Sequence, residues 1–359
     1  MTHAKPDILK DIWYLAGLSK EFRAGAMIRK VMFDEPIVIG RTKKGAMFAL
    51  RDICPHRAAP LSAGQMIEGD EAAGGATTVQ CPYHGWRMRT DDGACAAIPA
   101  LTAEQEFDTS KIRTPAFPLK EEHGLVWIYA PSDVKRMGTP RLPAPVIERP
   151  VGNGPHMIAR TFAECRYDEA VTGLIDPAHA AFVHKAWWWR ASTRTYEKTK
   201  EYEPAPQGFK MVAHPPSANG RIYKWLIGGA MTTEILFQLP GLRIETIRNE
   251  RHTIVGVTAI TPLEGEKLEL TQLFYWDLPI LSVLKPFLTP VGQAFLDQDG
   301  TVLANQQANM RHAPTMLYID DADRLAKWYQ KLKRDWRAAN DEGREFENEI
   351  EPATLRWKT

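Results

Sequence analysis

Two short segments, CPHR at residues 54–57 and CPYHGW at residues 81–86, carry the most specific signal in this chain. Each segment pairs one cysteine with one histidine, and the four candidate ligands are Cys54, His56, Cys81 and His84. Two thiolates and two imidazoles could hold zinc in a structural tetrahedral site. A mixed pair in each loop instead favours a [2Fe–2S] cluster in which one iron takes both cysteines and the other takes both histidines.

Length and composition predict a soluble protein of two domains. At 359 residues, the chain is about twice the usual size of one domain. Hydrophobic residues make up 44% and charged residues 25%, which is ordinary for a globular protein with a sizeable core. The net charge is +1, from 45 basic and 44 acidic residues, so no basic excess indicates nucleic-acid binding.

The sequence predicts neither a membrane span nor export. The most apolar long stretch, residues 278–296, is interrupted by Lys285, Pro286 and Pro290, so it is not expected to cross a bilayer. The N-terminal sequence MTHAKPDILKD has neither a basic region followed by an apolar run nor a small-residue cleavage site. We therefore expect a cytoplasmic protein with no membrane and no nucleic acid among its partners.

A proline-rich segment predicts the domain boundary. Prolines are most dense between Pro131 and Pro155. Proline fixes φ and lacks a backbone donor, so this segment cannot continue a helix or a central strand. We place the boundary inside it, which gives domains over residues 1–135 and 136–359.

Hydrophobic patterns predict an α+β fold. In the N-terminal domain, short β-rich runs lie at residues 35–39, 46–50 and 125–130. In the C-terminal domain, the alternation of an antiparallel meander runs over residues 222–227, 232–239, 242–247, 253–260 and 268–276. Helices are expected over residues 168–184, over residues 295–310, and near the C-terminus at Leu325, Trp328, Leu332 and Trp336. Helices segregated from the sheet indicate α+β and not alternating βαβ units.

The segment DPAHAAFVH at residues 176–184 is a second candidate metal site. On a straight helix, His179 and His184 would point about 140° apart, because five residues exceed one turn by that angle. They can converge on one ion only at a widened turn or at a helix end, and Pro177 can provide such a break. The alternative is that both histidines are ordinary core residues.

Taken together, these segments resemble the α subunits of the Rieske non-heme iron oxygenases. The similarity is to the monooxygenase and demethylase branch, which includes vanillate and dicamba demethylases. It runs over nearly the whole chain, from WYLAG at residues 13–17 to an acidic helix late in the sequence. The resemblance implies an all-β Rieske [2Fe–2S] domain followed by a helix-grip catalytic domain, with an antiparallel sheet, flanking helices and a mononuclear Fe(II).

In that family, two histidines and one carboxylate hold the mononuclear iron, leaving positions open for O2. Carried over by position, the histidine ligands are His179 and His184. The carboxylate should come from FLDQDGT at residues 295–301, where Asp297 and Asp299 compete. The family pattern favours Asp299, and the other aspartate would then interact with the helix dipole.

The resemblance also assigns a role to Asp176. In the family, an aspartate at this position links an iron-ligand histidine to a cluster-ligand histidine of the neighbouring subunit, which implies a homotrimer. The alternative is a helix N-cap ahead of Pro177.

Many members carry asparagine where this chain has Gly173, so the contribution of that asparagine amide must be made by another group or is lost. The run Trp187–Trp189 is expected to fill core or a subunit contact, in preference to lining the substrate pocket.

The resemblance implies an oxygenase component that uses O2 to hydroxylate, or to O- or N-demethylate, a small aromatic substrate. A ring cis-dihydroxylating dioxygenase is the alternative. A Rieske electron carrier without oxygenase activity is a third interpretation, but it needs only about the first 130 residues. No G-x-G-x-x-G motif follows a strand. Electrons are therefore expected from a separate NAD(P)H-dependent reductase, with or without a ferredoxin.

Overall fold

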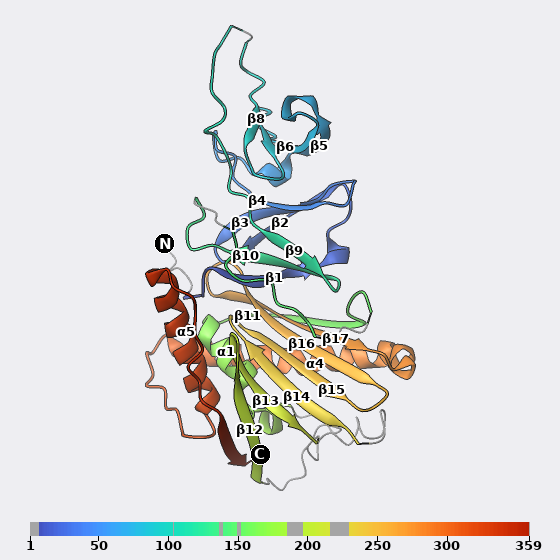
Figure 1. Cartoon of the computed structure of the whole chain (residues 1–359), viewed down its shortest axis with the longest axis vertical. Coiled ribbons are helices and arrows are strands. Elements are labelled where there is room, and N and C mark those ends of the chain that lie inside the picture. The colour runs from blue at the N-terminus through green and yellow to red at the C-terminus, as the bar shows by residue number, and fades with distance from the viewer. Residues whose placement is uncertain are drawn as a thin grey trace. The chain divides into compact units, whose positions relative to one another are not determined.

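The computed structural model describes residues 7–102, 104–135, 139–148, 152–184, 197–215 and 230–358. The chain divides into two compact units, Lys10–Val146 and Ile147–Thr359, the latter together with Met1–Leu9 (Figure 1). The division therefore falls later than the boundary expected between residues 135 and 136. Trp13 Nε1 donates a hydrogen bond to the carbonyl of Leu142 at 2.8 Å, which joins part of the connector to the N-terminal unit.

The N-terminal unit is built from three small antiparallel sheets. The first contains β1 (Ile12–Leu18), β10 (Leu125–Ala130) and β9 (Leu119–Glu122). The second contains β2 (Ala26–Met32), β3 (Glu35–Arg41) and β4 (Met47–Arg51). The third contains β5 (Gln65–Asp70), β6 (Ala76–Gln80), β7 (Arg87–Arg89) and β8 (Cys95–Ala97). Among the described residues of this unit, the helical elements are the 3-10 turns Ser19–Glu21, Leu61–Ala63 and Glu71–Ala73.

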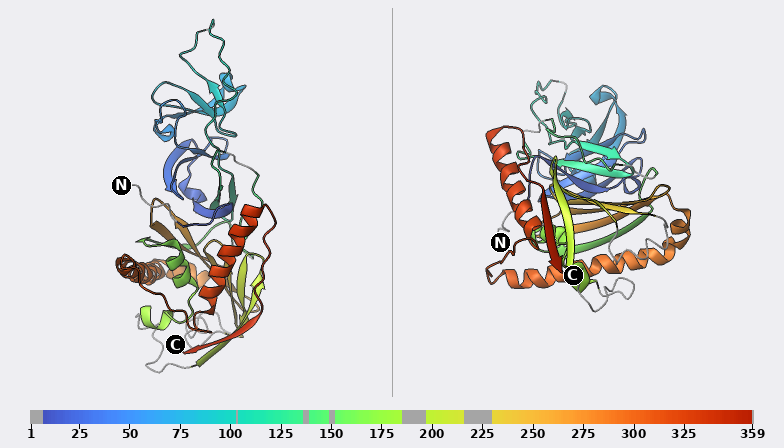
Figure 2. Two further views of the ribbon diagram at one scale, coloured as in Figure 1. Left: turned by 90° about the vertical axis from the view of Figure 1, so that its left-hand side faces the viewer. Right: turned by 60° about the horizontal axis from the view of Figure 1, so that its bottom comes forward.

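The C-terminal unit is an eight-stranded antiparallel sheet with helices on one face. The strand order is β11 (Met157–Glu164), β17 (Lys267–Trp276), β16 (Thr253–Pro262), β15 (Leu242–Arg248), β14 (Thr232–Gln238), β13 (Gly208–His214), β12 (Glu197–Ala205) and β18 (Ala353–Lys358). The helices are α1 (Tyr167–Ile175), α2 (Ala180–Val183), α4 (Pro279–Met310) and α5 (Arg324–Glu342). Figure 2 shows α4 and α5 against the sheet from two further directions. The predicted α+β class is confirmed.

One expected helix is longer in the structure, and two expected segments lie outside the described residues. The helix expected over residues 295–310 begins already at Pro279 and continues through Pro286 and Pro290. Each internal proline removes one backbone hydrogen bond, but both are exposed, so the carbonyls they free can be hydrated. The strand expected over residues 222–227 lies outside the described residues, as does the run Trp187–Trp189. In the part of the chain that is described, no helix is long and apolar enough to cross a membrane.

A buried charge cluster anchors α1 against α5. The Nζ of Lys333 is almost fully buried and donates to both carboxylate oxygens of Asp168 at 2.6 Å. The hydroxyl of Tyr329 donates to the same carboxylate at 2.7 Å. Asp168 lies in the first turn of α1, where a negative charge also favours the helix dipole. These contacts fix the helix whose far end leads into the histidine segment.

Candidate metal centres

The two cysteine–histidine loops lie beside each other at the third sheet of the N-terminal unit. CPHR follows β4, and CPYHGW connects β6 to β7. Each loop is closed by its own backbone: the N–H of Ala58 donates to the carbonyl of Cys54 at 2.9 Å, and that of Gly85 to Cys81 at 3.2 Å. Gly85 has a φ of +71°, which glycine adopts at little cost. The local sequence therefore brings the ligands of each loop together.

The four predicted cluster ligands form one group. Cys54 and Cys81 are both buried, and their side chains hydrogen bond to each other. Burial, together with the neighbouring Cys81, raises the pKa of the Cys54 thiol to about 11. The rings of His56 and His84 have centroids 4.6 Å apart, and the indole of Trp86 stacks on His56.

This group has the donor chemistry that a Rieske cluster needs. Among the described residues, the buried Nδ1 of His56 has no hydrogen-bond partner. A buried imidazole nitrogen without a partner is costly, and metal coordination would satisfy it. Metal coordination would also hold the cysteines as thiolates, although burial alone keeps Cys54 protonated. Two sulfurs beside two imidazoles suit a cluster with one iron bound to each kind of ligand.

The second candidate centre depends on a break after α1. The expected helix over residues 168–184 is interrupted, because Asp176 is extended and Pro177 cannot continue α1. The carboxylate of Asp176 accepts from the N–H of Ala178 at 2.7 Å, which closes the turn. The short helix α2 follows, with His179 at its N-cap and His184 at its C-cap. The two histidines therefore lie at helix ends, where they can converge.

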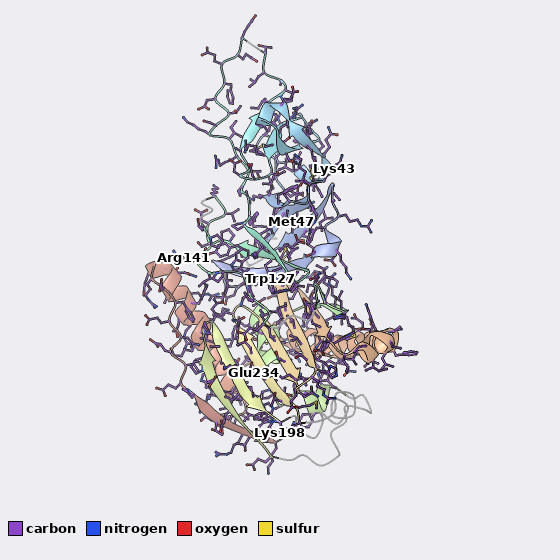
Figure 3. The ribbon with its side chains drawn as sticks, turned by 45° about the vertical axis from the view of Figure 1, so that its right-hand side comes forward. Lys43, Met47, Trp127, Arg141, Lys198 and Glu234 are labelled. Atoms are coloured by element: carbon purple, nitrogen blue, oxygen red, sulfur yellow. The ribbon has the colours of Figure 1, made fainter. Side chains whose placement is uncertain are left out.

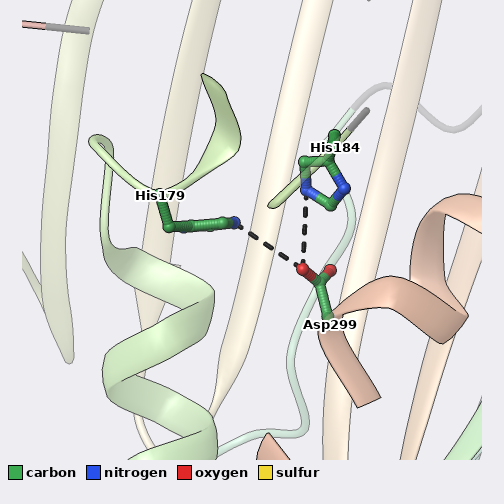
Figure 4. A group of neighbouring side chains, drawn as sticks. All are labelled: His179, His184 and Asp299. Atoms are coloured by element: carbon green, nitrogen blue, oxygen red, sulfur yellow. Dashed lines mark ion pairs between the residues drawn. The ribbon is translucent and has the colours of Figure 1, made fainter. Parts of the chain in front are cut away.

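The structure brings both histidines to Asp299, which lies on α4 (Figure 4). The Nε2 atoms of His179 and His184 lie 3.8 Å and 3.5 Å from Asp299 Oδ1. One ligand atom from each of the three residues lies within 4.8 Å of the others. Asp297 is exposed instead, and its carboxylate accepts from Gln293 Nε2 at 2.9 Å. Of the two competing aspartates, Asp299 is the one beside the histidines.

Hydrogen bonds orient both imidazole rings. His179 Nδ1 lies 2.8 Å from the main-chain carbonyl of Asp176, and His184 Nδ1 lies 3.3 Å from Gln298 Oε1. With both Nδ1 atoms engaged, both Nε2 atoms face Asp299, as in metal sites whose histidines are held by a hydrogen bond at the other ring nitrogen. Sequence reasoning missed Gln298, because an amide beside an aspartate has no distinctive spacing.

Burial disfavours the charged forms of His184 and Asp299. His184 is 2% exposed, and the ring of Phe295 stacks on its imidazole. Burial, together with the neighbouring His179, lowers the pKa of His184 to about 4. Burial raises the pKa of Asp299 to about 6, although His179 and Arg243 oppose that shift. Two imidazoles and one carboxylate are the donors of the facial triad that binds non-heme iron and leaves coordination positions open.

The triad borders a cavity of about 860 Å³ within the C-terminal unit. That volume is in the range of pockets that enclose a small organic molecule. Apolar side chains from the sheet and from α4 line much of it, including Phe209, Phe237, Ile247, Phe274, Phe295 and Leu303. A Cβ on Gly173 would make an ordinary contact with Leu303 at 3.8 Å, so packing does not require glycine there. The absence of a side chain at this position leaves the cavity wider.

Comparisons with known proteins agree with this architecture. Residues 12–118 match the Rieske [2Fe-2S] domain family. The chain is 31% identical over 185 residues to the oxygenase component of dicamba O-demethylase from Stenotrophomonas maltophilia, covering 50% of this chain and 48% of that protein. It is 30% identical over 176 residues to the chloroplastic chlorophyllide a oxygenase of Chlamydomonas reinhardtii, covering 49% of this chain and 24% of that protein. The matched part thus spans less than half the length of these relatives.

Solved structures extend the similarity in fold to most of the chain. A crystal structure of dicamba monooxygenase with non-heme iron and dicamba matches with a TM-score of 0.63 at 21% identity, over 91% of this chain and 98% of that one. The N-terminal unit therefore carries a Rieske [2Fe-2S] domain. Several relatives of the chain are named as oxygenases or oxygenase components, which agrees with the resemblance predicted from the sequence.

Proposed function

We propose that this chain is the oxygenase component of a Rieske non-heme iron monooxygenase acting on a small aromatic substrate. The observation that carries the proposal is the His179, His184 and Asp299 triad at the edge of a cavity, in a chain that also has a Rieske domain. A protein that only transfers electrons binds no organic substrate and does not need such a cavity. The names of the relatives, an O-demethylase oxygenase component and an oxygenase, support the same class of reaction.

The residues divide the work between two centres. Cys54, His56, Cys81 and His84 would hold the [2Fe–2S] cluster, and the triad would hold one Fe(II). When bound, these groups supply the one-electron and O2 chemistry that protein side chains lack. The chain itself orients the ligand imidazoles through Gln298 and the Asp176 carbonyl, and it shields the cavity from water with apolar side chains.

The overall reaction balances with an external reductant. Substrate C–H, O2, two electrons and two protons give the hydroxylated product and water. The electrons come from a separate NAD(P)H-dependent reductase, with or without a ferredoxin.

Asp176 would couple the triad of one subunit to the Rieske domain of a neighbouring subunit. The assembly would be a homotrimer that acts in the cytoplasm.

The fate of the product depends on which carbon is attacked. Hydroxylation of a methyl carbon on oxygen or nitrogen gives an unstable hemiacetal or hemiaminal, which releases formaldehyde and leaves the demethylated product. Attack on two adjacent ring carbons would instead give a cis-dihydrodiol, the alternative of a dioxygenase. The identity of the substrate decides between these outcomes.

Iron content and labelled dioxygen test the proposal. The purified chain is expected to hold about three irons, two in the cluster and one in the triad, whereas a carrier would hold about two. In a reaction with isotopically labelled O2 and a reductase, one labelled atom should enter the product or the formaldehyde, trapped before exchange. Two labelled atoms in one product would establish dihydroxylation. A chain with about two irons and no oxygen incorporation would contradict the proposal.

A further inference from the structure

The indole of Trp86 covers one face of a cluster ligand. Its ring lies nearly parallel to the imidazole of His56, at an interplanar angle of 5° with the ring centroids 4.6 Å apart. Trp86 is half-buried and packs against the core cluster that contains Cys54 and Cys81. A stacked ring cannot turn freely about its Cβ–Cγ bond, so the indole fixes the direction in which the buried Nδ1 of His56 points.

The backbone at Trp86 is held on both sides. The carbonyl of Trp86 accepts from the N–H of Cys81 at 2.8 Å, which closes the CPYHGW loop. The next residue, Arg87, begins β7, and its Nη1 donates to Asp70 Oδ1 at 2.8 Å. Trp86 and Arg87 share a peptide bond, so an anchored Arg87 restricts the positions that the indole can take.

Asp70 is a fixed partner for this arginine. Its side chain is only 1% exposed, and carboxylates are rarely buried unless they are paired. The carboxylate also accepts from Thr78 Oγ1 at 2.6 Å and from the N–H of Ala72 at 3.1 Å. Burial raises the pKa of Asp70, but these hydrogen bonds and the charge of Arg87 outweigh burial and leave the pKa below its usual value. The carboxylate is therefore charged at neutral pH.

The strand that ends at Asp70 is anchored in turn. Strand β5 pairs with β6, and β6 pairs with β7, so the sheet carries both members of the ion pair. The N–H of Lys43, which Figure 3 labels, donates to the carboxylate of Glu68 in β5. The contacts of Asp70 thus connect a well-supported strand to the tryptophan beside the cluster ligands.

We propose that Trp86, held by the Asp70–Arg87 pair, is a positioning residue that sets the reduction potential of the [2Fe–2S] cluster. With its sulfides, its two thiolates and two neutral imidazoles, the oxidised cluster has no net charge, and reduction adds one negative charge. Water would stabilise that charge, and the indole excludes water from one side of His56. The indole also turns its electron-rich face toward the ligand ring. Both effects disfavour the reduced cluster, so the stack lowers the potential.

Trp86→Leu is therefore expected to raise the potential. The whole cluster-loaded protein is titrated with dithionite against a redox dye at neutral pH, followed by the visible spectrum, with the EPR spectrum of the reduced cluster as a second readout. The equilibrium with the dye should shift at least about threefold toward the reduced cluster. Trp86→Phe keeps an aromatic face and should give a smaller shift. An unchanged potential in Trp86→Leu would overturn the proposal.

Arg87→Met distinguishes positioning from a direct effect of charge. Loss of a positive charge near the cluster would by itself make reduction harder, whereas release of the stack makes reduction easier. We expect the potential to rise in Arg87→Met and to return most of the way in Arg87→Lys. In the double variant with Trp86→Leu, Arg87→Met should no longer raise the potential, because it acts through the indole. A potential that falls or stays constant in Arg87→Met would contradict the role of the ion pair.

Arg89→Met is the matched control. Arg89 lies two residues further along β7 and pairs with Asp91, which is exposed. Its hydrogen bond to the carbonyl of Ala73 is long, at 3.4 Å, and does not involve Asp70. This variant should keep the wild-type potential. A rise equal to that of Arg87→Met would show that the Asp70 pair has no special part, and it would overturn the proposal.

The iron content and visible spectrum of each variant report whether the cluster has assembled. Should Arg87→Met fail to assemble it, Asp70→Asn takes its place, because asparagine keeps an oxygen for Thr78 while it removes the negative charge. A smaller rise in potential is expected from Asp70→Asn, and no rise would count against the pair. The potential is measured without substrate or turnover. A chain that shows these shifts but incorporates no oxygen would disprove the oxygenase function and leave this inference standing.

Discussion

Asp299→Ala is expected to empty the mononuclear site while the [2Fe–2S] cluster stays in place. The substitution removes the carboxylate that faces both Nε2 atoms, and the two remaining imidazoles offer a weaker site to a divalent cation. Iron should fall from about three to about two per chain, with the visible spectrum of the cluster unchanged. Turnover should fall by more than about 100-fold, because loss of an outer hydrogen-bond partner alone costs 10–100-fold.

Asp297→Ala is the control for this experiment. Asp297 lies on the same helix, two residues away, but it is exposed and pairs with Gln293. This variant should keep its full iron content and activity. Were Asp297→Ala to lose iron and Asp299→Ala to keep it, the assignment of the carboxylate ligand would have to be reversed.

Asp176→Asn is expected to keep both metal centres and lose nearly all turnover. An asparagine side chain still offers an oxygen to the N–H of Ala178, and the main-chain carbonyl that orients His179 is unchanged. The ligands should therefore stay in position, while the negative charge proposed to couple the two centres is gone. We expect a loss of at least about 100-fold in product formation with the reductase, of the order found when a partner of a ligand histidine is removed.

Iron content and product formation, measured on the same Asp176→Asn sample, distinguish a loss of electronic coupling between the two metal centres from a loss of the metal site itself. Iron content and the visible spectrum should equal those of the wild type, and product formed per chain is then compared under the same reductase concentration. A variant that loses iron would show that Asp176 acts only by holding the turn. A variant that retains iron and full activity would show that its charge has no role in coupling.

Much of the N-terminal site could be predicted because its determinants are local. Each ligand pair lies within four residues of sequence, in a loop closed by its own hydrogen bonds, so residue type and spacing suffice to propose a cluster. The β-rich runs expected over residues 35–39 and 46–50 are confirmed as the paired strands β3 and β4. The alternation in the C-terminal half likewise predicted strands that correspond to β14, β15, β16 and β17.

The ligands of the C-terminal site could not all be predicted from local sequence, because they come together only when helices and sheet pack. Asp297 and Asp299 point about 160° apart around one helix, so the choice between them depends on which face of α4 is turned toward the histidines. The histidines converge because α1 ends before Pro177, and the sequence suggested such a break without locating the two short helices around it.

Residue types, their spacing and their alternation thus determined which elements form and which side chains can act as ligands. The tertiary structure alone decided which distant side chains meet: Asp299 and Gln298 with the histidines, and Asp70 with Arg87. The physical reason is that periodicity assigns a side chain to one face of its element. The direction that this face points depends on how helices and sheet pack over their shared apolar surface.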